Sequence, residues 1–145
     1  MEEAAVGSPQ KRLARIHTLA RIGIAAVWIY HGLVPKLLYR DWSEMDLLHD
    51  MGVEIAIVPM ILQTFAYLEI SLGLLVLAHW RHRWPLWATI GIMIGGLLSV
   101  AKHSPKVLHA AFNPVTLNGL MLALAVIALI SQSPPVSKTA KSPSN

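Results

Sequence analysis

The stretch "IAIVPMILQTFAYLEISLGLLVLAH", from Ile55 to His79, decides the fold of this 145-residue chain. Glu69 is its only acidic residue, and it contains no Lys or Arg. A hydrocarbon core of roughly 30 Å is crossed by about 20 apolar residues in a helix, and this run is long enough. The whole chain agrees, with 54% hydrophobic residues, 14% charged residues and a mean hydropathy of +0.53. We therefore expect lipid to surround most of it.

Further apolar runs predict an all-α, antiparallel bundle of four transmembrane helices. The expected spans are about 19–38, 55–79, 84–102 and 112–131, within a single membrane domain over 15–131. The polar ends, 1–14 and 132–145, are predicted to be disordered tails. The basic start of the first run also resembles a secretory signal. No small-residue cleavage site leads into a polar mature domain, so we interpret the run as a retained span.

Lys and Arg are concentrated in the N-terminal flank, in the middle loop "HWRHRWP" and in the C-terminal tail. Cytoplasmic segments carry this excess, so both termini are predicted to be cytoplasmic in a multi-pass protein of the bacterial inner (plasma) membrane. The basic residues lie at the ends of apolar runs and form no basic face. The lipid bilayer is therefore the expected partner, and nucleic acid is not.

The first external loop has an amphipathic pattern of its own. Acidic residues alternate with Trp42, Met45, Leu48 and Met51 at helical spacing, and Gly52 offers a stop. The pattern predicts a short helix lying on the outer membrane face. An acidic docking surface for a partner is the alternative.

Glu69 lies near the middle of the second span, where an unpaired carboxylate is costly. It is expected to face the bundle interior, with the indole N–H of Trp28 or the hydroxyls of Ser71 and Thr89 as donors. Its role is either to carry protons or orient a ligand, or only to hold helices together as a neutral acid.

A second set of polar residues falls in the outer half of the spans and predicts a polar cavity open to the outside. His31 and Asn118 are expected to be near each other across the bundle, with Lys36 at the rim, where its ammonium snorkels to the interface. The other members are Gln63 and Asn113.

Metal and haem sites are not favoured. His and carboxylate side chains do not converge at one depth, and His103, the second candidate haem ligand beside His31, lies at a helix end. The chain has no cysteine, which excludes disulfides, thiolate metal sites and a dithiol relay. Gly32 permits close packing, while Gly91 and Gly95 share one helix face that would serve packing or self-association, so a homo-oligomer stays open.

Three segments together resemble the DoxX-like family of small four-span membrane proteins. They are "RIGIAAVWIYHGLVPKLL", "YLEISLGLLVL" and "AFNPVTLNGLMLALAVIAL", and the resemblance covers about 15–130. The positions that match the family pattern are Trp28, Gly32, Pro35, Lys36, Glu69, Gly73, Asn113, Pro114 and Asn118.

The resemblance implies a quinone as ligand and a membrane or extracytoplasmic redox protein as partner, because namesake members are associated with quinone-linked oxidoreductase complexes. Relatives that perform thiol redox use cysteines, which this chain lacks. We expect a subunit that binds a quinone or small lipophile, with Glu69 handling protons or the headgroup and Trp28 and Tyr30 flanking the ring. The isolated chain is not expected to be an enzyme. The alternative is a non-enzymatic scaffold, assembly factor or small transporter.

Overall fold

The computed structural model describes residues 9–39, 42–111 and 113–132, which form helices and short connections without any strand. In chain order the elements are α1 (Pro9–His31), the π-helix η1 (Gly32–Leu38), α2 (Trp42–Asp50), α3 (Val58–Ala78), α4 (Trp84–His103), the 3-10 helix η2 (Pro105–His109) and α5 (Pro114–Ser131). Four helices are long and apolar enough to cross a membrane: α1 with η1, α3, α4 and α5. The predicted all-α fold with four spans is confirmed. Which side of the membrane the termini face stays a prediction.

The first span is longer than the sequence predicts. It runs from Pro9 to Leu38, so it begins inside the segment 1–14 that is expected to be a tail. Proline suits the first turn of a helix because its missing N–H has no intrahelical partner there. The rest of the predicted tails, 1–8 and 133–145, lies outside the described residues.

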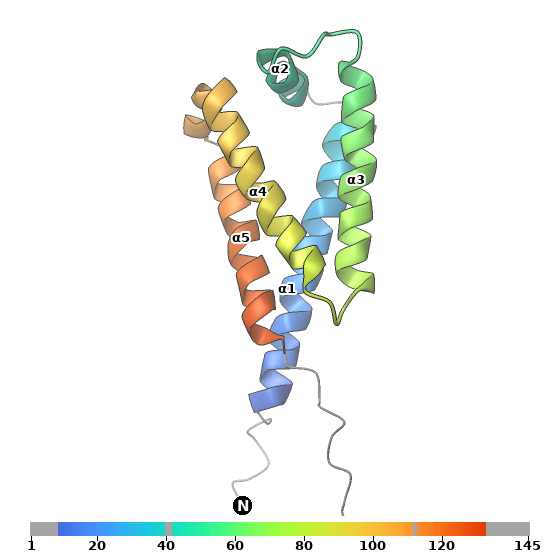
Figure 1. The fold of residues 1–145 in the computed structure, drawn as a ribbon, viewed down its shortest axis with the longest axis vertical. Helices are drawn as coiled ribbons and strands as arrows, with labels where there is room; N and C mark the ends of the chain where they lie inside the picture. Colours follow the sequence, from blue (N-terminus) through green and yellow to red (C-terminus); the bar gives the residue numbers. More distant parts are fainter. Residues whose placement is uncertain (1–8, 40–41, 112, 133–145) are drawn as a thin grey trace, which may run out of the picture.

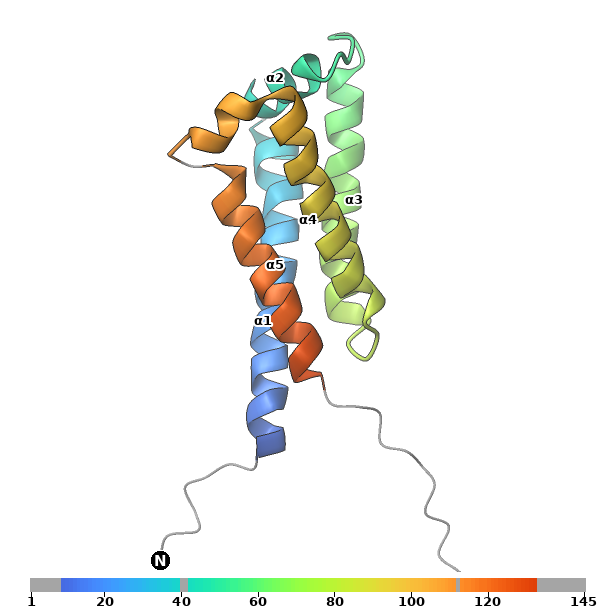
Figure 2. The ribbon, with the colours of Figure 1, turned by 60° about the vertical axis from the view of Figure 1, so that its left-hand side comes forward.

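Helix α1 is the centre of the bundle. It packs against α3 on one side and α5 on the other, while α4 packs mainly on α5 (Figures 1 and 2). The core is formed largely by side chains such as Ile24, Trp28, Val76 and Leu86, which are almost fully buried. Towards α2, helices α4 and α5 diverge from α3, and α2 lies above that divergence (Figure 1).

Glycines let η1 and α1 approach α3 closely. A Cβ added at Gly32 would lie 2.5 Å from the carbonyl oxygen of Ala66, and one at Gly73 would lie 2.9 Å from that of Ala25. Gly91 and Gly95 differ, because nothing lies within 4 Å of a Cβ added at either position. The expected close packing at these two glycines is therefore absent within the described chain.

Arg21 fixes the opposite end of the bundle. Its guanidinium is fully buried and donates hydrogen bonds to the carbonyl oxygens of Val76 (2.7 Å), His79 (3.1 Å) and His82 (2.5 Å). These carbonyls lie at the C-terminal end of α3 and just beyond it, where backbone acceptors have no helical partner and a positive charge is favourable. The guanidinium also lies 5.8 Å from the ring centroid of Trp80. Arg21 thereby ties α1 to the α3–α4 loop.

Pro35 explains the π-helical end of the first span. Inside an α-helix its ring would clash with the carbonyl of His31, and it has no N–H to donate. The wider turn relieves this conflict, and Tyr39 N donates to Val34 O, five residues earlier, at 3.0 Å. Such π-helical turns are frequent at functional sites. Here the turn carries Lys36, which is buried.

We predict that Gly32→Ala destabilises the protein by about 1–3 kcal/mol, because the added methyl group collides with the α3 backbone. Gly91→Ala is the matched control, and it should leave stability unchanged or raise it by up to about 1 kcal/mol through helix propensity. Thermal unfolding of both variants in the same mild detergent measures the difference. Equal melting temperatures for the two variants would contradict the close crossing of η1 and α3.

Candidate functional site

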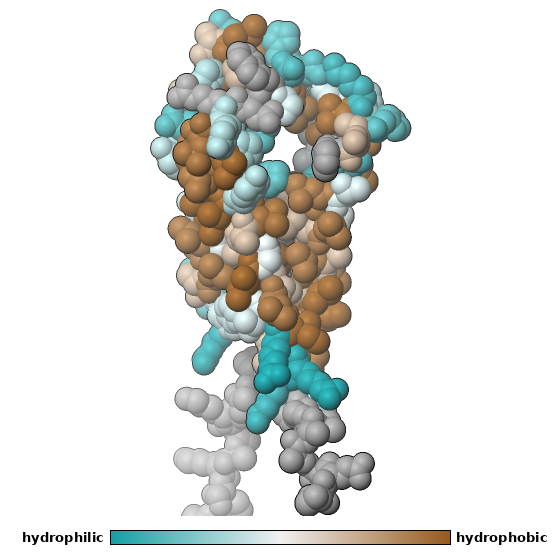
Figure 3. Space-filling model, turned by 180° about the vertical axis from the view of Figure 1, so that it is seen from behind, coloured by the Kyte–Doolittle hydropathy of each residue, from teal (hydrophilic) through white to brown (hydrophobic). Residues whose placement is uncertain are grey.

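A cavity of about 650 Å³ lies where the helices diverge, beneath α2. The molecule is visibly hollowed at this end (Figure 3). All four spans and the short helices α2 and η2 contribute to its walls, which are mostly apolar. The side chains that line the cavity include Trp28, His31, Lys36, Glu44, Glu69, Met93, Asn113, Thr116, Leu117, Asn118, Leu120 and Met121.

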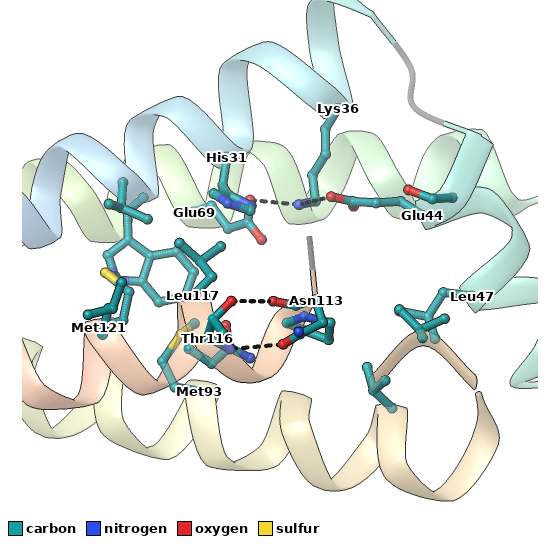
Figure 4. Close-up of a pocket in the computed structure, with 18 residues that line it drawn as sticks. His31, Lys36, Glu44, Leu47, Glu69, Met93, Asn113, Thr116, Leu117 and Met121 are labelled. Atoms are coloured by element: carbon teal, nitrogen blue, oxygen red, sulfur yellow. Dashed lines mark hydrogen bonds and ion pairs between the residues drawn. The ribbon is translucent and has the colours of Figure 1, made fainter. Parts of the chain in front are cut away.

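One ammonium group joins two carboxylates at the cavity wall. Lys36 Nζ lies 3.0 Å from Glu44 Oε1 and 2.9 Å from Glu69 Oε2. The three residues come from η1, α2 and α3, and Figure 4 shows Lys36 reaching between the two acids. The Lys36 side chain is only 6% exposed, so its charge depends on these partners. The cluster therefore holds α2 to the first two spans.

This arrangement corrects two expectations. Lys36 does not snorkel to the interface, because α2 covers the end of the first span and places the ammonium inside the protein. Trp28 does not donate to Glu69. Its indole Nε1 donates to Thr89 Oγ1 at 3.1 Å, and that hydroxyl donates to the carbonyl oxygen of Pro85. Lys36 takes the place of the neutral donors that were expected at Glu69.

Opposite the ion cluster, polar groups from α5 line the cavity. Asn113 is the N-cap of α5, with its Oδ1 accepting from Thr116 N at 3.0 Å and its Nδ2 donating to Ala110 O. Asn118 lines the same cavity, and its amide has no hydrogen-bond partner among the described residues. His31 also lines it, but no hydrogen bond joins His31 to Asn118 in this part of the chain.

Two residues expected at the site lie elsewhere. Gln63 is exposed and donates to the hydroxyl of Tyr67 at 3.3 Å, outside the cavity lining. Tyr30 is 59% exposed and does not line the cavity, so it does not flank a ring bound there together with Trp28. Both residues lie on the outer faces of their helices. The length of a span and the depth of a residue in it do not show which face of the helix that residue occupies.

Helix α2 is fastened to the bundle at its far end as well. Ser104 Oγ donates to Asp50 Oδ2 at 2.5 Å, and Leu48 packs into a small cluster with Val58 and Leu62. Gly52 has a φ of +85°, and Val53 N donates back to Leu48 O, which is the expected helix stop. Because Glu44 pairs with Lys36 and Asp50 accepts from Ser104, α2 acts as a roof, and two charges of the expected acidic docking surface already have partners within the chain.

Sequence reasoning missed Glu44, Met93 and Met121 as cavity residues. Glu44 was visible only as part of an amphipathic pattern, which predicts a helix but not which side faces inward. His103, weighed as a haem ligand, has its Nδ1 3.0 Å from the carbonyl oxygen of Ser99 one turn earlier. The described residues contain no group of three potential metal ligands.

A model of the DoxX-like family matches residues 25–126. The chain belongs to the DoxX-like family. The matched range contains every residue that lines the cavity. No curated protein and no solved structure matches the chain.

The cavity of this DoxX-like protein combines apolar walls with a few polar groups of different kinds. Carboxylates accept hydrogen bonds, an ammonium donates, and the amide of Asn118 does both. Such sites bind molecules with an apolar body and a polar head. The arrangement therefore suits a small amphipathic ligand.

We predict that Lys36→Met lowers stability by about 3 kcal/mol, because two partly buried carboxylates lose their shared partner. Replacing Lys36 by Met together with Glu44→Gln and Glu69→Gln should recover most of that loss, since no charge remains. Lys106→Met, at an ammonium that is 81% exposed, is the control and should change stability by less than about 0.5 kcal/mol. Denaturant titration in detergent measures all three. A single variant as stable as the wild type would refute the cluster.

Proposed function

We propose that this DoxX-like protein binds a quinone or a similar small lipophile in the cavity beneath α2 and thereby supports a membrane redox complex. One observation carries the proposal: an apolar cavity of about 650 Å³ inside a four-span protein has a polar ion cluster at its wall. A lipophile with a polar ring matches that division between apolar and polar surface.

The residues of the cavity fit such a headgroup. Trp28 and Met121 offer flat and adaptable apolar surface, and both are nearly fully buried. The amide of Asn118, which has no partner among the residues that the structure describes, can donate to a ring carbonyl or accept from a ring hydroxyl. A bound quinone would supply two-electron, two-proton redox chemistry, for which the protein must provide a group that holds or moves protons.

Glu69 is suited to hold such a proton. Lys36 is shared between two carboxylates, so protonation of Glu69 leaves the ammonium paired with Glu44. Breaking a buried ion pair is costly because it leaves a buried charge without a partner. Protonation of Glu69 leaves no such unpaired charge. The cluster can therefore exist in two protonation states with α2 still attached.

A non-enzymatic scaffold, assembly factor or small transporter is the second candidate function. The same cluster favours it in one respect, because it ties η1, α2 and α3 together and would serve stability alone. The two functions differ in whether the cavity retains a ligand when the polar groups are changed one at a time.

We predict that Asn118→Leu weakens the binding of decyl-benzoquinone about tenfold, because one hydrogen bond worth about 1.4 kcal/mol is lost. Gln63→Leu removes an amide from the outer face of α3 and is the matched control, with unchanged affinity. Equilibrium binding to protein in lipid nanodiscs measures both. Equal affinities of the two variants would place the ligand outside the cavity.

We predict that Glu69→Gln still inserts and folds but loses most of the lipophile that purifies with the wild type. Extraction of purified protein with organic solvent, followed by chromatography, measures the bound ligand. An unchanged ligand complement would remove Glu69 from ligand binding and favour the scaffold function, since an amide can still hydrogen-bond between helices.

A further inference from the structure

The cavity is open between the helices on the side of η1 and α5. In the described chain the backbone of η1 lies close to α1 and α3, and that of α5 lies close to α1, α4 and η2, but the backbones of η1 and α5 do not come close to each other. Seen from behind, the space-filling view shows an opening through the molecule at this level (Figure 3). The two helices that border this side of the cavity therefore leave a gap between them.

One edge of α5 belongs both to the cavity and to the outer surface. Thr116 and Leu120 line the cavity and are one helical turn apart, yet both are exposed, Leu120 by 65%. Their neighbour Met121 lines the same cavity but is 1% exposed. The edge formed by Thr116 and Leu120 is thus the margin of an opening, and Met121 lies behind it.

The end of the cavity under α2 is closed by polar and apolar contacts. Glu44 pairs with Lys36, Asp50 accepts from Ser104, and Leu48 packs into its apolar cluster. Passage through this end would require these contacts to separate, including a charge pair that is largely removed from water. The side between η1 and α5 has no comparable barrier in the described chain.

We propose that the lipophile enters and leaves sideways from the bilayer, through a portal between η1 and α5 bordered by Thr116 and Leu120, while α2 remains a fixed roof. The inference rests on the proposed function and specifies the ligand class. The ligand is a molecule dissolved in the membrane, whose tail stays among lipid chains while its head reaches Asn118 and the Lys36 cluster. A water-borne solute does not fit this route.

A disulfide between α2 and the end of α4 tests the fixed roof. The side chains of Asp50 and Ser104 face each other and the chain has no cysteine, so Asp50→Cys with Ser104→Cys gives a single possible bridge. Labelled decyl-benzoquinone is bound to the protein in nanodiscs, and its release into excess unlabelled quinone is timed. Oxidised and reduced samples of the same variant should release it within twofold of each other. Release that slows at least tenfold on oxidation and recovers on reduction would overturn the proposal.

A substitution at the portal tests the route itself and does not depend on the bridge. Leu120→Phe narrows the opening and should slow release at least fivefold. Leu98→Phe adds the same bulk on α4 at a residue that is 66% exposed and outside the cavity lining, so it should match the wild type. Equal release from the two variants would overturn the portal.

The two proposals fail in different ways. If wild-type protein in nanodiscs binds no decyl-benzoquinone above the level of empty nanodiscs, the proposed function fails, and the portal with it. If the wild type binds but oxidation of the α2 bridge stops release, the lipophile-binding function stands and only the lateral route is wrong.

Discussion

The sharing of one ammonium by two carboxylates is the interaction on which the half of this protein next to α2 depends. Lys36 pairs with Glu44 and Glu69 together, and each of the three groups belongs to a different element. Without it the cavity wall would hold unpaired charges, and α2 would keep only its contacts near Leu48 and Asp50. The cluster therefore places charges at the cavity wall and joins its roof to the first two spans.

The cluster depends in turn on local backbone chemistry. Pro35 cannot continue an α-helix, and the π-helical turn that accommodates it presents Lys36 to the interior. Gly32 brings that turn against α3, where Glu69 is placed. At the other end of the bundle Arg21 and the α3–α4 loop fix α1 relative to α3. A proline, a glycine and two cations thus determine how the first two spans meet.

The sequence was sufficient for the parts of the fold that depend on length and apolar composition. The spans over α3, α4 and α5 begin and end close to their predicted limits, and the short helix ending at Gly52 is present. The partners of the charged side chains were harder to predict from the sequence, because they depend on how the helices pack against one another. Arg21 and Lys36 both look like flanking cations in the sequence, yet both are buried by contacts with residues far along the chain or in the next helix.

The site was predicted in part for the same reason. Trp28, His31, Asn113 and Asn118 do line the cavity, because their depth places them near it, whereas Gln63 and Tyr30 share that depth but face outward. Whether a residue faces the cavity or the outside depends on the rotation of its helix about the helix axis. A membrane helix is apolar on every side, so the periodicity of its sequence does not reveal that rotation. The sequence indicates the rotation only where a small residue, such as Gly73, allows one face of the helix to pack closely against a neighbouring helix.

The proposed lateral route requires that the cavity exclude phospholipids, and the ion cluster would contribute to this. When both carboxylates are ionised, Glu44 and Glu69 outweigh the single charge of Lys36, and the ammonium already contacts both. An anionic phosphate that entered beside Leu120 would meet this excess of negative charge in a region of low dielectric, where like charges repel strongly. A neutral ring that only accepts and donates hydrogen bonds meets no such barrier. The same three side chains that attach α2 would therefore favour a neutral headgroup over anionic lipids at the proposed portal.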